Sequence, residues 1–114
     1  MLRNMAAIFL CMLTASAVSA NQYIVTDAIV TKVGSTAGNG ESFWVVAKHG
    51  QGSCVSQSSQ VNVYFPRTAA NSEKIFDRAY EAALSALTTG KRVNIYNYAD
   101  SSCDKAVAIE LLAN

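Results

Sequence analysis

The chain has 114 residues, of which 51% are hydrophobic and 15% are charged, and its formal net charge at pH 7 is +1. This length fits one compact domain rather than two. A chain with so small a net charge has no strong positive potential to attract nucleic acid or an anionic membrane surface, so neither is expected as a partner.

The first twenty residues have the pattern of a secretory signal peptide. Arg3 precedes an apolar stretch at 6–13, and small residues then lead to Ala20, after which cleavage is expected. A membrane anchor is the alternative, but the apolar stretch is much shorter than the roughly 20 residues needed to span a bilayer. The sequence therefore predicts a secreted or periplasmic protein with a signal peptide at 1–20, a single domain at 21–114 and no membrane span in the mature chain.

Two cysteines remain beyond the predicted leader, which itself contains Cys11. In an exported protein an even pair is expected to form a disulfide, here between Cys54 and Cys103. Closing a loop of about 50 residues would stabilise the fold by roughly 4 kcal/mol in the chain-entropy model. Free thiols or metal ligands are the alternative, but no histidine or acidic cluster accompanies the pair, so neither a metal nor another cofactor is expected.

Three strands are predicted in the first half of the mature chain, at residues 23–34, 42–49 and 60–65. The first is long enough to bend or bulge around Asp27. In the second and third strands, apolar and polar side chains alternate. The inward positions are expected to be Phe43, Val45, Ala47, Val61, Val63 and Phe65. The segments at 35–41 and 50–59 are rich in turn residues, so a turn and a loop are expected there.

One helix is predicted at residues 72–90, with Asn71 or Ser72 as its N-cap and Gly90 as its stop, because glycine adopts left-handed backbone without steric cost. The apolar side holds Ile75, Phe76, Ala79, Tyr80, Ala82, Ala83, Leu84, Ala86 and Leu87. That side covers more than half of the circumference, whereas a helix lying on one sheet needs an arc of only about 100°. The helix is therefore expected either to be deeply buried or to have a second contact surface, as in a homo-oligomer.

Two further strands are predicted after the helix, at residues 91–98 and 105–113, with a turn at 99–104 between them. Three strands, a helix and two strands (β-β-β-α-β-β) is the element order of the OB-fold, a five-stranded Greek-key barrel. The fold class is thus expected to be mainly β with one helix, which would plug the open end of an OB-fold-like barrel. An open α+β sandwich with the same element order is the alternative.

No catalytic motif is present in the sequence, and an enzyme is not expected. The chain has one histidine, His49, and contains no G-x-S-x-G turn, H-E-x-x-H motif, P-loop or dinucleotide fingerprint. General acid–base catalysis usually needs two placed titratable groups, whereas the acidic residues here are scattered along the chain. A small hydrolase would require Asp27, His49 and Asp104 to converge in space.

The outward strand positions combine aromatic rings with amide and guanidinium groups. They are Trp44, Asn62, Tyr64, Arg92, Asn94, Tyr96 and Tyr98. Such a surface suits sugars, because their C–H faces stack on rings while their hydroxyls bond to amide and arginine donors, and OB-folds are known to bind oligosaccharides. The alternative is that aromatic residues lie outward because they fit a pleated surface, or that the set is split between two sides of the barrel.

The segment FDRAYEAALSALTTGKRVNIYNY (76–98) resembles part of the binding (B) subunits of AB5 toxins related to subtilase cytotoxin and the pertussis-like toxins. There, a helix with an Arg–Ala pair and an aromatic residue ends in a Thr–Gly step, and a Val-x-Ile strand follows. The strand YIVTDAIVTKVG (23–34) and the cysteines match in order as well. The chain is more closely similar to an uncharacterised branch of small exported gram-negative proteins that share this domain.

This resemblance implies an OB-fold, a non-enzymatic role and a ring of five subunits with the helices lining its centre. In the toxin subunits a serine near the start of the first strand contacts sialylated glycans, and Thr26, followed by Asp27, occupies the matching place. The resulting prediction is an exported, non-enzymatic binding module that recognises glycans. The alternative is a periplasmic factor, of the inhibitor or envelope-stress type, that binds another exported protein and has no toxin role.

Overall fold

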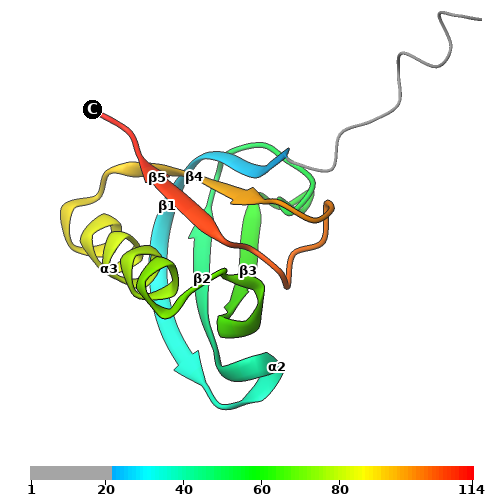
Figure 1. Cartoon of the computed structure of the whole chain (residues 1–114). Coiled ribbons are helices and arrows are strands. Elements are labelled where there is room, and N and C mark those ends of the chain that lie inside the picture. The colour runs from blue at the N-terminus through cyan, green and yellow to red at the C-terminus, as the bar shows by residue number, and fades with distance from the viewer. Residues whose placement is uncertain (1–21) are drawn as a thin grey trace, which may run out of the picture.

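The computed structural model describes residues 22–114, so the predicted signal peptide lies outside the described residues. The elements are β1 (Gln22–Thr36), α2 (Gly38–Glu41), β2 (Ser42–Lys48), β3 (Gln60–Pro66), η1 (Arg67–Ala69), α3 (Glu73–Thr89), β4 (Arg92–Asn97) and β5 (Ala108–Leu111). Figure 1 shows the strands curving around a common interior, with α3 packed against one end. The predicted mainly β fold, with its one long helix between the third and fourth strands, is confirmed.

Strand β1 is the centre of an antiparallel sheet with the order β3-β2-β1-β4-β5. Its residues 29–36 pair with β2, while its residues 22–29 pair with β4. The register shifts between Val25 and Ala28, where Asp27 has a left-handed backbone (φ 59°), and again between Val30 and Lys32. Because bulges bend a strand, one long strand can belong to two parts of the wall, and the predicted bulge at Asp27 is confirmed.

The segment before β5 returns to β3 and closes the barrel. The Tyr64 N–H donates to the Cys103 carbonyl (2.9 Å), and the Ala106 N–H donates to the Tyr64 carbonyl (3.1 Å). The predicted disulfide between Cys54 and Cys103 is present and joins the loop after β2 to this segment, with the two Cα atoms 5.7 Å apart. These hydrogen bonds connect β3, at one edge of the sheet, to the segment that precedes β5 at the other edge. The fold is therefore barrel-like rather than an open sandwich.

The predicted inward residues form the core. Phe43 lies at its centre, where its ring stacks on Phe65 with 4.4 Å between the centroids and meets the rings of Phe76 and Tyr80 at 5.4 and 5.2 Å. The two latter residues stand one turn apart on α3, so the helix packs through aromatic contacts onto one end of the barrel. Buried alanines share the inner face of the helix, namely Ala79, Ala83 and Ala86.

Both ends of α3 are formed by residues that the sequence predicted for them. The Ser72 hydroxyl accepts a hydrogen bond from the Ile75 N–H (3.2 Å), which satisfies one of the free donors of the first turn. Gly90 ends the helix with a left-handed backbone (φ 76°). Of the two candidate caps, Ser72 is therefore the one used.

Of the two alternatives for the broad apolar side of α3, deep burial of the whole side is excluded, because Ile75, Leu84 and Leu87 remain 37–38% exposed. The last strand is shorter than the predicted 105–113, because the segment just before β5 bonds to Tyr64 in β3. The predicted turn at 35–41 includes the short helical element α2, although Asn39, Gly40 and Glu41 all have left-handed backbone. Within residues 22–114, no helix is both long and apolar enough to cross a membrane.

Replacing both Cys54 and Cys103 by serine should lower the free energy of unfolding by about 4 kcal/mol, because the bond closes a loop with a sequence separation of 49. Urea unfolding followed by circular dichroism measures the change. A reducing agent should destabilise the wild type to a similar extent and leave the double variant unaffected. Equal urea midpoints for the two proteins would contradict this expectation.

Candidate functional site

The eight residues predicted to bind a ligand fall into two groups on the outer surface. The first group lies on β1 and β4 and comprises Thr26, Asp27, Arg92, Asn94 and Tyr96. The second lies on β2 and β3 and comprises Trp44, Asn62 and Tyr64. Because β2 and β4 pair with different halves of β1, the structure does not bring the two groups together into one site.

Three members of the first group, Asp27, Arg92 and Asn94, take part in a chain of hydrogen bonds, here called the β4 network, that runs from β1 across β4 to β5. Arg92 donates to the Asp27 carboxylate, and the Asp27 N–H donates to the Asn94 side-chain oxygen (3.0 Å). The Asn94 amide donates to Glu110 (3.0 Å), whose other carboxylate oxygen accepts from the Tyr23 hydroxyl (3.0 Å). The members of the network are therefore partnered with one another.

Two members of the β4 network were missing from the predicted set. Glu110 alternates with the inward Ile109 and Leu111 on β5, and Tyr23 opens β1, so strand parity alone could have placed both on the outer face. The hydrogen bond to Glu110, followed by partial desolvation, raises the pKa of the Tyr23 hydroxyl. The Tyr23 ring also meets Tyr96 edge to face, with the centroids 4.6 Å apart.

Thr26 faces a different neighbour. Its N–H and carbonyl bond to Gln51 (2.7 and 3.0 Å), and its hydroxyl donates to the Gln51 carbonyl (3.3 Å). The loop comes this close because Gly52 lies against β1, where a Cβ atom would overlap the Ile24 carbonyl. The Thr26 hydroxyl therefore holds the 50–54 loop against the strand.

The second group centres on the Trp44 and Tyr64 rings, whose centroids are 6.0 Å apart with 34° between the ring planes. The two residues are paired across β2 and β3. The Trp44 indole lies over Gly34 of β1, where a Cβ atom would overlap the ring. Glycine at this position thus leaves room for the indole. Asn62 is exposed two pairs further along β3.

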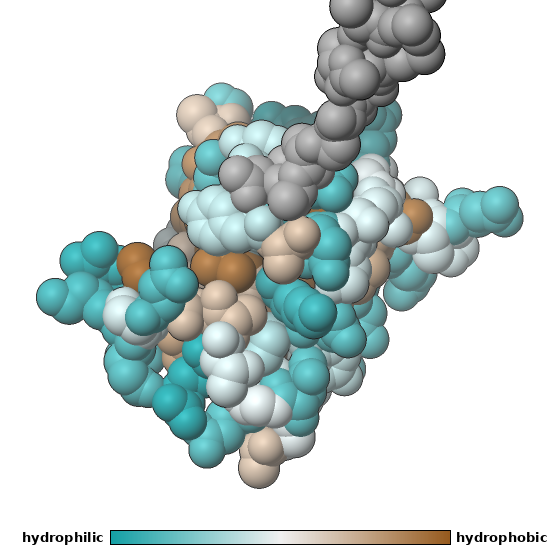
Figure 2. All heavy atoms as spheres, turned by 45° about the vertical axis from the view of Figure 1, so that its right-hand side comes forward, coloured by the Kyte–Doolittle hydropathy of each residue, from teal (hydrophilic) through white to brown (hydrophobic). Residues whose placement is uncertain are grey.

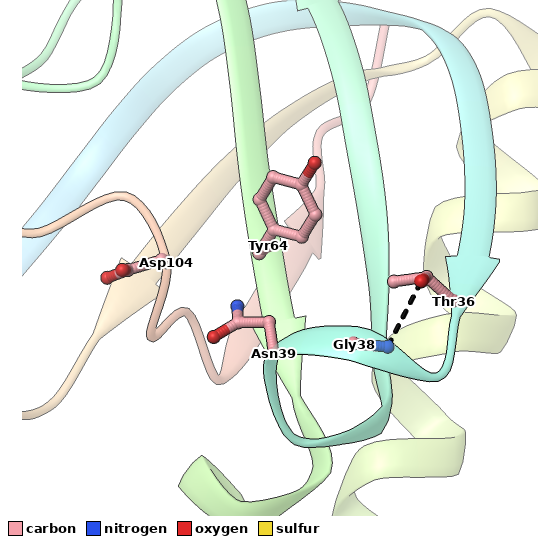
Figure 3. A pocket seen from close by; sticks show the side chains of 5 residues that line it. All are labelled: Thr36, Gly38, Asn39, Tyr64 and Asp104. Carbon is pink, nitrogen blue, oxygen red and sulfur yellow. Dashed lines mark hydrogen bonds between the residues drawn. The ribbon is translucent and has the colours of Figure 1, made fainter.

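A pocket of about 400 Å³ lies beside Tyr64 and is called the Tyr64 pocket (Figure 3). Its lining residues are Thr36, Gly38, Asn39, Tyr64 and Asp104. The Thr36 hydroxyl accepts a hydrogen bond from the Gly38 N–H (3.1 Å), so its own proton remains free to donate. Figure 3 shows the Asn39 side chain rising from the 36–41 turn beside Tyr64, while the Asp104 carboxylate projects away from the ring. The pocket therefore offers an aromatic ring together with amide and hydroxyl groups.

Sequence reasoning missed Thr36, Asn39 and Asp104 as site residues. Each belongs to a segment that was expected to be a turn, and Asp104 was considered only for the hydrolase alternative. Asp104 reaches Tyr64 only because the segment after Cys103 bonds to β3, and that contact joins residues far apart in the sequence. No local pattern in the sequence signals this meeting.

The structure gives no support to a hydrolytic triad of Asp27, His49 and Asp104. Asp27 is ion-paired with Arg92 on the β4 network, His49 follows β2 with a left-handed backbone (φ 67°), and Asp104 lines the Tyr64 pocket. No hydrogen bond links the three side chains within residues 22–114. The same part of the chain contains no group of three or more His, Cys, Asp or Glu residues placed to hold a metal ion.

A family model described as "Family of unknown function (DUF5992)" matches residues 4–113. The chain matches no curated protein and no solved structure.

Replacing Gly34 by alanine should displace the Trp44 indole, because the new Cβ would occupy the volume of the ring. We expect a changed fluorescence maximum, which reports on Trp44 because the chain has one tryptophan, and a loss of stability of about 1–3 kcal/mol. Gly38→Ala is the matched control, since its Cβ would lie 3.7 Å from the nearest atom, the Thr36 hydroxyl oxygen. An unchanged emission spectrum for Gly34→Ala would show that the indole is not seated on Gly34.

Replacing Glu110 by glutamine should lower the pKa of Tyr23 towards its ordinary value of 10.0, because the carboxylate that accepts its proton is the main cause of the raised value. An NMR titration of the tyrosine rings measures the change. Because the folded-state pKa is the higher one, the bond stabilises the protein below the unfolded pKa and is lost as the pH rises through the folded pKa. Glu81→Gln, on the exposed side of α3, should leave Tyr23 unaffected, and a similar shift in both variants would argue against the contact.

Proposed function

The chain belongs to the family of unknown function DUF5992, and we propose that this member is an exported, non-enzymatic binding module that recognises glycans. The observation that carries the proposal is the Trp44–Tyr64 aromatic pair, whose Tyr64 lines a pocket that also holds the polar side chains of Thr36 and Asn39. The proposed binding surface consists of this pair and the Tyr64 pocket.

The chemistry of this surface matches that of a sugar. A sugar ring presents C–H groups on its faces, which pack on aromatic rings, and hydroxyls on its rim, which donate and accept hydrogen bonds. Asn39 offers both a donor and acceptors, and Thr36 offers a free hydroxyl proton. The pocket volume of about 400 Å³ also lies within the range of roughly 300–1,000 Å³ that is typical of small-molecule sites.

The β4 network is a weaker candidate for the same role. Its Arg92, Asn94 and Tyr23 groups already bond to Asp27 and Glu110, so a ligand would have to displace these bonds before forming its own. The Thr26 hydroxyl, which the toxin resemblance suggests for glycan contact, is engaged with the Gln51 carbonyl. The proposal therefore assigns the glycan to the Tyr64 pocket instead.

Figure 2 turns the right-hand side of Figure 1 towards the reader. Hydrophilic or neutral residues cover most of the face that it shows, and hydrophobic residues gather mainly left of its centre. The disulfide supports export, because such bonds persist in oxidising compartments and are rare in the cytosol.

A second candidate function, binding of another protein, is supported by α3. Ile75, Leu84 and Leu87 expose more than a third of their surface on this helix. Leu84 and Leu87 are three residues apart and therefore lie on the same side of the helix. We propose that these two form a contact either with further copies of this chain, as in the ring of a toxin B subunit, or with another exported protein.

The glycan proposal is tested by probing a glycan array with the purified protein and its variants. Trp44→Ala and Tyr64→Ala should each weaken binding by up to about tenfold, because an aromatic contact contributes roughly 0.5–1.5 kcal/mol beyond the area it buries. Tyr98→Ala is the control, since this tyrosine is 52% exposed and lies beyond β4, where it contacts Tyr96. The proposal fails if the wild type binds no glycan, or if the three variants bind equally well.

The mass of the protein in solution tests the assembly. Light scattering should give a multiple of the monomer mass for the wild type, and a Leu84→Ser, Leu87→Ser double variant should be monomeric, because the polar side chains remove apolar contact area. Lys74→Ser, a substitution on the polar side of the same helix, should leave the mass unchanged. A monomeric wild type would exclude the ring and leave a different exported protein as the partner of α3.

A further inference from the structure

A second pocket lies on the other side of the 36–41 turn, between the turn and α3, and is called the Phe43 cleft. Its volume is about 360 Å³. The lining residues are Ser35, Thr36, Glu41, Ser42, Phe43, Phe76, Asp77 and Tyr80. Thr36 is the residue it shares with the Tyr64 pocket, so the two cavities are separate neighbours.

Aromatic rings form the base of the Phe43 cleft. Phe43 is buried, and the Phe76 and Tyr80 rings lean against it with tilts of 60° and 69°. Both of these α3 rings are only half-buried and line the cavity. The base therefore presents the electron-rich π-systems that attract a positive charge brought close to them.

Carboxylates lie at the rim of the cleft. Glu41 comes from the turn and Asp77 from α3, between the two aromatic residues in the sequence. Glu41 accepts a hydrogen bond from Arg67 (2.7 Å), and the same guanidinium reaches Glu73 at 3.3 Å. Asp77 belongs to none of the ion pairs found within residues 22–114. The lining of the cleft thus includes two carboxylates and no basic group, and Arg67, which pairs with Glu41, lies outside that lining.

We propose that the Phe43 cleft binds an organic cation with a quaternary ammonium head, of the choline type. Such a head donates no hydrogen bond, so it is recognised by aromatic rings and by negative charge placed nearby, and the cleft supplies both. A primary ammonium is more strongly hydrated, and it would give up three hydrogen bonds to water to sit on an aromatic base. The Thr36 hydroxyl, which is free to donate, lies at the same cavity and can meet the oxygen at the other end of a choline molecule.

The test titrates the purified disulfide-bonded protein with choline and follows backbone amide shifts by NMR. Choline should shift the amides of α3 around Asp77 and of the 35–42 segment in a saturable way. The matched control ligand is the neutral isostere of choline in which carbon replaces the nitrogen. The isostere should bind at least fivefold more weakly, because it keeps the shape and loses the charge that both ring and carboxylate attract. Equal binding of the two ligands would overturn the proposal.

Variants separate the contributions of charge and ring. Asp77→Asn and Tyr80→Leu should each weaken choline binding by about fivefold, since each removes one attraction for the cation. Glu81→Gln removes a carboxylate from the next turn of α3 without touching the cleft, and it should bind choline as the wild type does. Asp77→Asn keeps the shape of the side chain, so its result stands even if Tyr80→Leu disturbs folding. If Asp77→Asn binds choline as tightly as the wild type does, the proposal is wrong.

The same head group occurs both in free choline and in phosphatidylcholine. Sedimentation with phosphatidylcholine vesicles, compared with phosphatidylglycerol vesicles, distinguishes the two sources. Retention on the first type alone would show that the cleft accepts the head group at a membrane surface. Binding of free choline without retention on vesicles would assign the cleft to the free cation. Neither the choline titration nor the vesicle experiment involves Tyr64. A negative result in both would therefore leave the glycan proposal unaffected.

Discussion

The closure of the barrel by Tyr64 is the constraint on which the rest of the structure depends. Both backbone groups of this residue bond to the segment between Cys103 and Ala106, and the disulfide fixes the same segment to the loop after β2. Tyr64 alternates on β3 with the buried Val63 and Phe65, so its side chain points outward, and the bonded segment carries Asp104 into the lining of the same pocket. The link that completes the fold therefore also builds a wall of the Tyr64 pocket.

The bulged strand β1 explains why outward residues do not make a single surface. One half of β1 pairs with β2 and the other half with β4, and the bulges redirect the strand between them. Side chains that share the outward parity thus point in different directions around the barrel. Parity established that Trp44, Tyr64, Arg92 and Asn94 face outward, but only the pairing partners of β1 show which of them are neighbours.

Much of the fold could be predicted because its signals are local. The alternation around Val45 and Val63, the Ser72 cap and the Gly90 stop each act within a few residues, and the disulfide followed from a count of cysteines. The failures concern contacts between distant segments. The length of β5 depends on what the preceding residues bond to, and the exposure of Leu84 depends on where α3 meets the barrel. The same limitation applies to the site, since Asn39 and Asp104 carry no motif.

The turn between β1 and β2 connects the two pockets physically. Asn39, Gly40 and Glu41 adopt left-handed backbone in succession, a conformation that costs a residue such as glutamate about 1–2 kcal/mol. Asparagine tolerates it through its short polar side chain, and glycine has no side chain to clash. For Glu41 the cost is offset in part by the hydrogen bond from Arg67. As a result, Asn39 lines the Tyr64 pocket and Glu41, two residues later, lines the Phe43 cleft. A turn without these left-handed residues would not place Asn39 and Glu41 at two different cavities. The strained backbone and the two cavities are therefore one structural feature.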